Sequence, residues 1–96
     1  MTADDAEDDS VRVWLVERTY SDDEQNLIIL TYATTDGRQY FRKERALTSF
    51  DDVRETTAAV AAAPENLGRV IDEDERRQYA AEAQRMAEKH DPEDVI

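Results

Sequence analysis

A strand–turn–strand pattern between Leu27 and Glu44 limits the folds open to this chain more than any other feature. The run LIILTYAT (27–34) begins with four aliphatic residues, which indicates a strand buried on both faces at its start. Asp36-Gly37 follows, a pair typical of the two-residue type I′ hairpin turn, because glycine tolerates positive φ and aspartate does so better than most residues. The run RQYFRKE (38–44) then predicts a strand that returns antiparallel to the first.

A further strand is predicted ahead of this hairpin. The run VRVWLVERTY (11–20) alternates with the period of two that is typical of strands, and the polar residues 21–26 connect it to LIILTYAT. Three strands in this order predict an antiparallel meander with LIILTYAT in its centre.

Two helices are predicted after the strands. A capping-box pattern at Ser49, followed by an apolar stripe and the alanine run 58–63, predicts one helix that ends at Pro64. A similar start at Asp72 predicts a second helix over residues 73–90. The expected fold is an α+β domain of order β-β-β-α-α, with both main helices packed on one face of the sheet.

The chain is long enough for one domain. Residues 1–10 hold five carboxylates and almost nothing apolar, so they are expected to form a disordered acidic tail ahead of a domain over residues 11–90. Residues 91–96 are expected to form a C-terminal tail. No apolar run approaches the roughly 20 residues that span a bilayer, and the acidic N-terminus is unlike a signal peptide, so a cytoplasmic protein without membrane contact is expected.

The charge balance indicates the salt conditions in which the chain works. Twenty-four carboxylates face twelve cations, for a formal charge of −12, and ten of the cations are arginines. Abundant carboxylates with few lysines are the pattern expected of a halophilic protein, since charge repulsion is screened within about 3 Å at 1 M ionic strength and carboxylates keep the surface hydrated. A mesophilic acidic protein or an acidic mimic of nucleic acid remains the alternative.

Two strings carry a resemblance to known sequences. The run VWLVERTYSDDEQNLIILTYATTDG, with ALTSF just beyond it, resembles a group of small acidic haloarchaeal proteins of uncharacterised function. The resemblance covers residues 11 to about 90. It implies a high-salt cytoplasm, but no activity, cofactor or catalytic residue.

Strand pairing divides the side chains of the predicted sheet between two faces. With Thr31 opposite Arg42 and Tyr20 opposite Leu27, one face is apolar and is expected to pack against the helices; it holds Val11, Val13, Leu15, Ile28, Leu30, Tyr32 and Phe41. The other face interleaves arginine with aromatic residues, and its candidate binding residues are Arg12, Trp14, Arg18, Tyr20, Arg38, Tyr40 and Arg42. A one-residue slip of the first strand would instead send Trp14 to the core.

Three interpretations of this arginine-aromatic face stay open. The arginines could cover exposed rings and pair with some of the many carboxylates. The face could bind an unidentified protein partner or a second copy of the chain, because arginine, tyrosine and tryptophan are enriched at interface hot spots. It could also stack the bases of a nucleic acid, although concentrated salt weakens phosphate contacts. The sequence favours a protein contact over nucleic acid.

No pattern predicts an enzyme. His90 is the only histidine and falls in the last turn of a predicted helix, cysteine is absent, and two glycines cannot form a glycine-rich phosphate loop. The acidic run from Asp72 to Glu75 lacks the central glycine of a calcium loop. We therefore expect no catalytic residue, no metal site and no cofactor.

Overall fold

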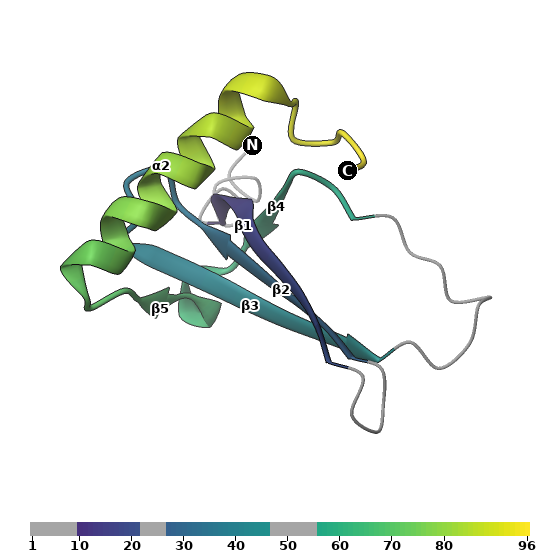
Figure 1. The fold of residues 1–96 in the computed structure, drawn as a ribbon, viewed down its shortest axis with the longest axis horizontal. Coiled ribbons are helices and arrows are strands. Elements are labelled where there is room, and N and C mark those ends of the chain that lie inside the picture. Colours follow the sequence, from purple (N-terminus) through teal and green to yellow (C-terminus); the bar gives the residue numbers. More distant parts are fainter. Residues whose placement is uncertain (1–9, 22–26, 47–55) are drawn as a thin grey trace, which may run out of the picture.

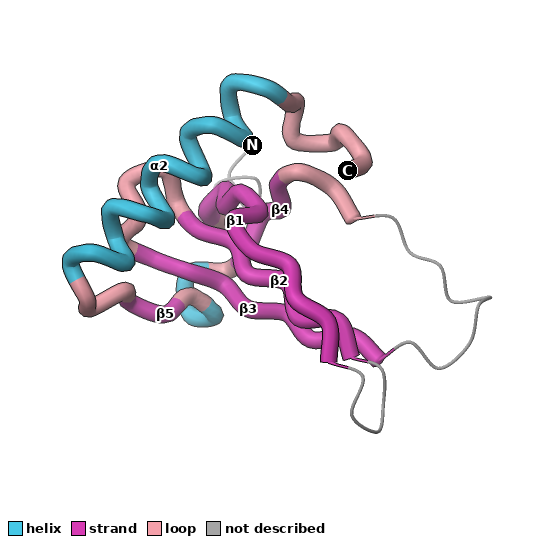
Figure 2. Tube along the Cα trace, viewed as in Figure 1, coloured by secondary structure: helices cyan, strands magenta, loops and turns pink. Residues whose placement is uncertain are grey.

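A five-stranded antiparallel sheet carries one helix on one of its faces in the part of the chain that the computed structural model describes, residues 10–21, 27–46 and 56–96 (Figure 1). The strands lie in the spatial order β4-β1-β2-β3-β5. Figure 2 separates strands, helices and loops. The elements, in chain order, are β1 (Val11–Ser21), β2 (Leu27–Ala33), β3 (Gln39–Ala46), β4 (Ala59–Ala62), the 3₁₀ turn η1 (Pro64–Asn66), β5 (Gly68–Arg69) and α2 (Glu73–Lys89).

The predicted order β-β-β-α-α is wrong, because the alanine run forms an edge strand instead of a helix. Ala59–Ala62 pairs with β1, and Val13 lies opposite Val60. Alanine favours helices by less than about 0.7 kcal/mol per residue over most other residues, so pairing with the open edge of β1 and burial of Ala58 outweigh this preference. Ser49 and the start of the predicted helix lie outside the described residues.

The predicted β2–β3 register is confirmed, while the predicted turn is wrong. Thr31 lies opposite Arg42, as expected from the hairpin. The Thr34 N–H, however, donates to the Gln39 carbonyl at 3.1 Å, and the Gly37 N–H donates to the Thr34 carbonyl at 2.9 Å. The loop therefore covers residues 35–38 and not two residues, and a four-residue loop of this kind is built around one tight turn.

A β-bulge in β1 divides the predicted pairing of β1 with β2. Trp14 lies opposite Ala33, on the face where the sequence places it. Beyond the irregularity between Leu15 and Glu17, Tyr20 lies opposite Ile28 and not opposite Leu27. The predicted register is therefore wrong for the second half of the strand, because the extra residue in the bulge shifts every pair that follows.

The predicted apolar face forms a core, against which Met86 of helix α2 packs, but the helix lies mainly on the other face. Val13 and Leu30 are the largest fully buried side chains, and Leu67 packs against their cluster. Residues 63–67 join β4 to β5 at opposite edges of the sheet. Edges that are four strand spacings apart would be about 19 Å apart in a flat sheet, so this short link favours a sheet curled around its apolar face.

Helix α2 packs on the opposite face, the one predicted to be free for binding. Trp14 is only 8% exposed and lies in a cluster with Ala59 and Ala83, and Ala87 packs against this cluster. Figure 1 shows the helix crossing one end of the strands, while the other ends of β1, β2 and β3 extend beyond it. The small side chains of Ala59, Ala83 and Ala87 allow the helix to approach the sheet closely. The strands carry apolar residues on both faces, so this face can be covered as well.

The predicted second helix is confirmed, and both of its ends are capped. The Asp72 carboxylate accepts a hydrogen bond from the Glu75 N–H at 3.1 Å, and the His90 N–H donates to the Met86 carbonyl at 2.9 Å. The C-terminal residues then run beside residues 56–59: the Ile96 N–H donates to the Thr56 carbonyl at 2.9 Å. In the described residues, no helix has the length and apolar composition needed to cross a membrane.

Candidate functional site

The β2–β3 turn rests directly on the backbone of helix α2. Gly37 is buried with φ at 72°, and a Cβ atom there would overlap the Arg76 carbonyl oxygen and lie 2.8 Å from the Ala80 nitrogen. The Gln84 side chain donates to the Thr35 carbonyl at 2.9 Å. Only glycine combines this close approach with a positive φ at little cost. The turn and the helix are therefore held together, with surface hollows beside the contact.

Hydrogen bonds hold Asp36 ionised in this turn. Its Oδ1 accepts from the Thr34 hydroxyl at 2.6 Å and from the Arg38 N–H at 3.0 Å. These two bonds lower the pKa of Asp36 below its ordinary value of 3.8, the Thr34 bond most, and the Arg38 charge adds to the effect. The carboxylate therefore stabilises the turn, and it also interacts with the charge of Arg38.

A cleft of about 600 Å³ lies between the edge of the sheet and the start of the helix. We call it the β5–α2 cleft. Tyr40 packs on Gly68, where a Cβ atom would lie 2.6 Å from the ring carbon Cζ. Ile71 is 82% exposed at the same site. The lining residues are Tyr40, Arg42, Arg69, Val70, Ile71, Asp72, Glu73, Glu75 and Tyr79.

Tyr79 brings a phenol from the helix to this cleft. Burial raises the pKa of its hydroxyl above the ordinary value of 10.0, and the charges of Glu75 and Glu17 raise it further, while Arg42 acts in the opposite direction. Tyr79 therefore stays neutral at physiological pH and can offer a ring and a hydroxyl. It has no feature of an activated acid or base.

A second hollow of about 440 Å³ lies on the turn side of Val70. We call it the arginine pocket. It is lined by Asp36, Arg38, Gln39, Arg69, Val70 and Arg76. Three arginines and one aspartate give this lining a formal charge of +2, whereas the whole chain carries −12. The β5–α2 cleft, with two arginines and three carboxylates, has a formal charge of −1.

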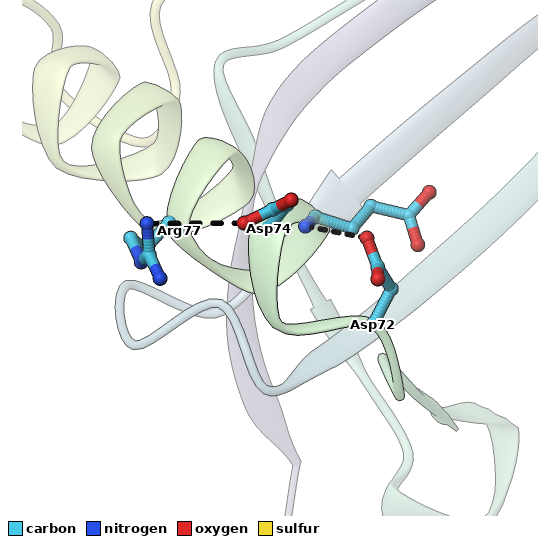
Figure 3. Close-up of polar contacts among 4 residues, drawn as sticks. Asp72, Asp74 and Arg77 are labelled. Carbon is cyan, nitrogen blue, oxygen red and sulfur yellow. Dashed lines mark hydrogen bonds and ion pairs between the residues drawn. The ribbon is translucent and has the colours of Figure 1, made fainter.

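The arginines of these two hollows differ from those on the outer side of the helix. Arg77 lies 3.8 Å from Asp74, as Figure 3 shows, and Arg85 pairs with Glu82. By contrast, no carboxylate of the described residues lies within 4.0 Å of the guanidinium nitrogens that line the cleft and the pocket, those of Arg38, Arg42, Arg69 and Arg76. Within the described part of the chain, these four arginines therefore make no contact ion pair with a carboxylate.

The structure distributes the seven predicted binding residues over separate places. Trp14 lies under the helix, Arg12 is exposed opposite Ala61, Tyr20 is 66% exposed, and Arg18 donates to the Ile96 carbonyl at 3.5 Å. The helix covers Trp14, and the bulge shifts the pairing of Arg18 and Tyr20 with β2 by one residue. The remaining three, Arg38, Tyr40 and Arg42, line the two hollows.

Sequence reasoning missed the residues that complete the hollows. Arg69 lines both of them, yet it belongs to a two-residue strand that is too short for any periodic pattern. Ile71 precedes the cap Asp72 without any pattern of its own. Arg76 and Tyr79 lie three residues apart in the helix that follows this cap, and residues three apart on a helix share a side. This spacing was the signal that could have placed them on one side.

His90 and Asp72, two residues weighed for catalysis or metal binding, lie at the two ends of helix α2. His90 caps the helix, and its Nδ1 lies 3.6 Å from Asp94. Asp72 caps the other end. In the described ranges, no cluster of three or more histidine, cysteine or acidic side chains could hold a metal ion. The two hollows offer arginine and tyrosine side chains and one exposed aliphatic side chain, that of Ile71.

Comparison with known proteins gives the family of the chain. No curated protein matches it, and no solved structure matches it either. The family comparison matches residues 7–96, nearly the full length of the chain. The chain therefore belongs to a family of unknown function, DUF7967.

Proposed function

We propose that the chain is a non-enzymatic protein of a high-salt cytoplasm that binds another protein chain at the β5–α2 cleft. The observation that carries this proposal is the set of arginines without an ion pair among the described residues, beside an exposed Ile71 in an acidic protein. Twice as many carboxylates as cations, with ten arginines among the twelve cations, support the halophilic part.

The exposed apolar surface supports a protein contact at the cleft. Ile71 is the most exposed of the large apolar residues in the described part of the chain. Tyrosine rings at positions 40 and 79 and arginines at 42 and 69 surround it. Aromatic and arginine side chains around a solvent-exposed aliphatic residue are the composition of an interface centre.

The charge pattern of the cleft favours a second copy of the chain as the partner. Arg42 and Arg69 stand on the sheet side, and Glu73 and Glu75 stand on the helix side. A two-fold axis beside Ile71 would place the arginines of each copy against the carboxylates of the other. One surface that carries both charges is self-complementary in this way, as an isologous dimer requires.

Nucleic acid is the weaker alternative. Trp14, the largest ring of the proposed base-stacking face, lies under helix α2 and is not available to a base. Three carboxylates also line the cleft and would repel a phosphate backbone. Tyr40 and Tyr79 alone make a small stacking surface compared with the aromatic platforms that bind single strands.

Charge exchange across the cleft tests the proposal. The first variant is Arg42→Glu with Arg69→Glu, and the second is Glu73→Arg with Glu75→Arg. In a two-fold dimer each variant faces like charges in its homodimer, whereas a mixture of the two faces opposite charges at both copies of the contact. Light scattering at about 2 M KCl, where repulsion between distant charges is screened, measures the mass of each sample.

We expect the wild type to be a dimer, each variant alone to associate at least about tenfold more weakly, and the mixture to recover the dimer. The matched control is Arg77→Glu with Arg85→Glu, which makes the same charge change on the outer side of the helix. A wild type that stays monomeric at millimolar concentration would overturn the second copy as partner. Equal weakening by the control would overturn the cleft as the interface.

A further inference from the structure

The arginine pocket differs in charge from the two other hollows compared with it. Its formal charge is +2, whereas the β5–α2 cleft carries −1 and a third hollow, beside Val16 and lined by Glu17 and Glu82, carries −2. At 1 M salt the screening length is about 3 Å, so a bound anion would sense the arginines around it and little of the overall −12. The pocket can therefore attract an anion although the chain as a whole repels one.

Arg76 provides the second observation. Its Nε atom is buried and has no hydrogen-bond partner among the described residues. Buried donors are rarely left without an acceptor in native proteins, since each one loses its bonds to water on folding. Arg77, the next residue, pairs with Asp74 on the outer side of the same helix. Of these two adjacent arginines, Arg77 lies outward with an ion-pair partner, and the Nε atom of Arg76 is buried with no hydrogen-bond partner among the described residues.

The pocket is assembled from three separate segments of the chain. Arg38 comes from the end of the hairpin loop, Arg69 from β5 and Arg76 from the helix. Contact between Gly37 and the backbone at Arg76 holds the loop and the helix together. The one carboxylate in the lining, that of Asp36, is occupied by the Thr34 hydroxyl and the Arg38 N–H. An anion entering the pocket thus meets guanidinium groups that make no contact ion pair with a carboxylate of the described residues.

We propose that the arginine pocket binds a small molecule through a phosphate or carboxylate group, held by Arg38, Arg69 and Arg76. The volume of about 440 Å³ falls within the range of about 300–1,000 Å³ that is usual for small-molecule sites. The planar guanidinium fork binds two oxygens at once, which a spherical chloride ion cannot match. This geometry lets an oxyanion compete with chloride in concentrated salt.

The test observes Arg76 directly. ¹⁵N-labelled protein is titrated with potassium phosphate or potassium succinate, in exchange for KCl at constant ionic strength, and the Nε–Hε resonances of the arginines are followed by NMR. We expect the Arg76 resonance to shift and saturate with one of the two probes, and the Arg77 resonance to stay in place. The probe that saturates the shift shows whether phosphate or carboxylate is the preferred group. Linear drift of all arginine resonances with both probes would overturn the proposal.

Two variants separate this pocket from the proposed dimer contact, and amide spectra of each variant report its folding. Arg76→Lys keeps the charge but loses the fork, and Arg38→Gln removes a residue that lines the pocket and not the cleft. We expect each to weaken binding of the preferred probe at least about tenfold and to leave the mass at about 2 M KCl unchanged. Arg77→Lys is the matched control and should bind as the wild type does. If Arg38→Gln binds as tightly as the control, the pocket is not the site, whatever the outcome for the cleft.

Discussion

Arg76 and Arg77 are adjacent in the sequence and lie in opposite surroundings. Arg77 points outward and pairs with Asp74, whereas Arg76 lies against the hairpin turn with its Nε atom buried. The outer arginines compensate charge, as expected of cations in an acidic protein. The inner arginines are held around hollows without such partners in the described residues. Their placement by the fold, and not their number, therefore distinguishes the two groups.

The difference between the inner and the outer arginines depends first on the packing of helix α2 against the sheet. We expect Trp14→Ala to lower the free energy of unfolding by about 3–5 kcal/mol, because the substitution leaves a cavity between β1 and the helix. Tyr20→Ala, on the same strand but 66% exposed, should change it by less than about 0.5 kcal/mol. Denaturant unfolding in concentrated KCl measures both. Similar losses in the two variants would mean that the helix does not rest on Trp14.

Contact between the turn and the helix is the next requirement. We expect Gly37→Val to cost about 2–5 kcal/mol, since a branched residue at positive φ is strained and its Cβ would overlap the Arg76 carbonyl. Thr35→Val, in the same exposed loop, keeps the backbone carbonyl that accepts from Gln84 and should cost less than about 0.5 kcal/mol. Equal unfolding midpoints for the two variants would contradict the docking of turn on helix.

A smaller effect is expected at the start of the helix. Asp72→Ala removes the acceptor of the Glu75 N–H and should lower the free energy of unfolding by about 0.5–2 kcal/mol. The same measurement on Asp74→Ala, which removes only an exposed ion pair with Arg77, should show a loss of no more than about 0.5 kcal/mol. A larger loss at position 74 than at 72 would reverse the assigned roles.

Protonation of Asp36 at low pH should have a still smaller effect on the free energy of unfolding. The pKa of Asp36 is lower in the folded chain than its ordinary value of 3.8, so its contribution to stability is present above that value and is lost as the pH falls through the folded pKa. Asp36→Asn should therefore make stability less dependent on pH below about 4. Unfolding curves between pH 2 and 6 for wild type and variant test this, and identical slopes would contradict it.

Alkali should act on Tyr79 in the complementary way. The pKa of Tyr79 is raised in the folded chain, so its contribution is complete below the ordinary value of 10.0 and is lost as the pH rises through the folded pKa. The phenolate absorbance that is lost in Tyr79→Phe should therefore develop above pH 10.0 in the wild type. A lost component that develops mainly below pH 10.0 would contradict this.

The sequence predicts the parts of this fold that local chemistry determines. The hairpin predicted around Asp36-Gly37 placed Thr31 opposite Arg42, and the Asp72 cap located the start of the helix. The alanine strand was missed because helix preference is a weak local effect, and the edge of β1 that overrides it comes from a distant part of the chain. The bulge after Leu15 leaves no trace in the alternating pattern.

The candidate site was predicted only in part, for a related reason. The strands carry apolar residues on both faces, so the sequence does not determine which face the helix covers. Trp14 became buried by the covering helix and not by the slip of register considered for it. The hairpin residues Arg38, Tyr40 and Arg42 line the hollows, and the register of this hairpin was predicted correctly. Arg69 lies beside them because β5 pairs with β3 at the edge of the sheet, which the sequence did not predict.

The most direct test of the account is the stability of Arg42→Gln with Arg69→Gln, measured on dilute, monomeric protein at about 2 M KCl, where long-range repulsion is screened. If these arginines are held for binding, their removal should change the free energy of unfolding by less than about 0.5 kcal/mol while the mass of the concentrated sample falls to that of the monomer. A loss of about 1 kcal/mol or more, with the mass unchanged, would show that they stabilise the chain itself and would contradict the account.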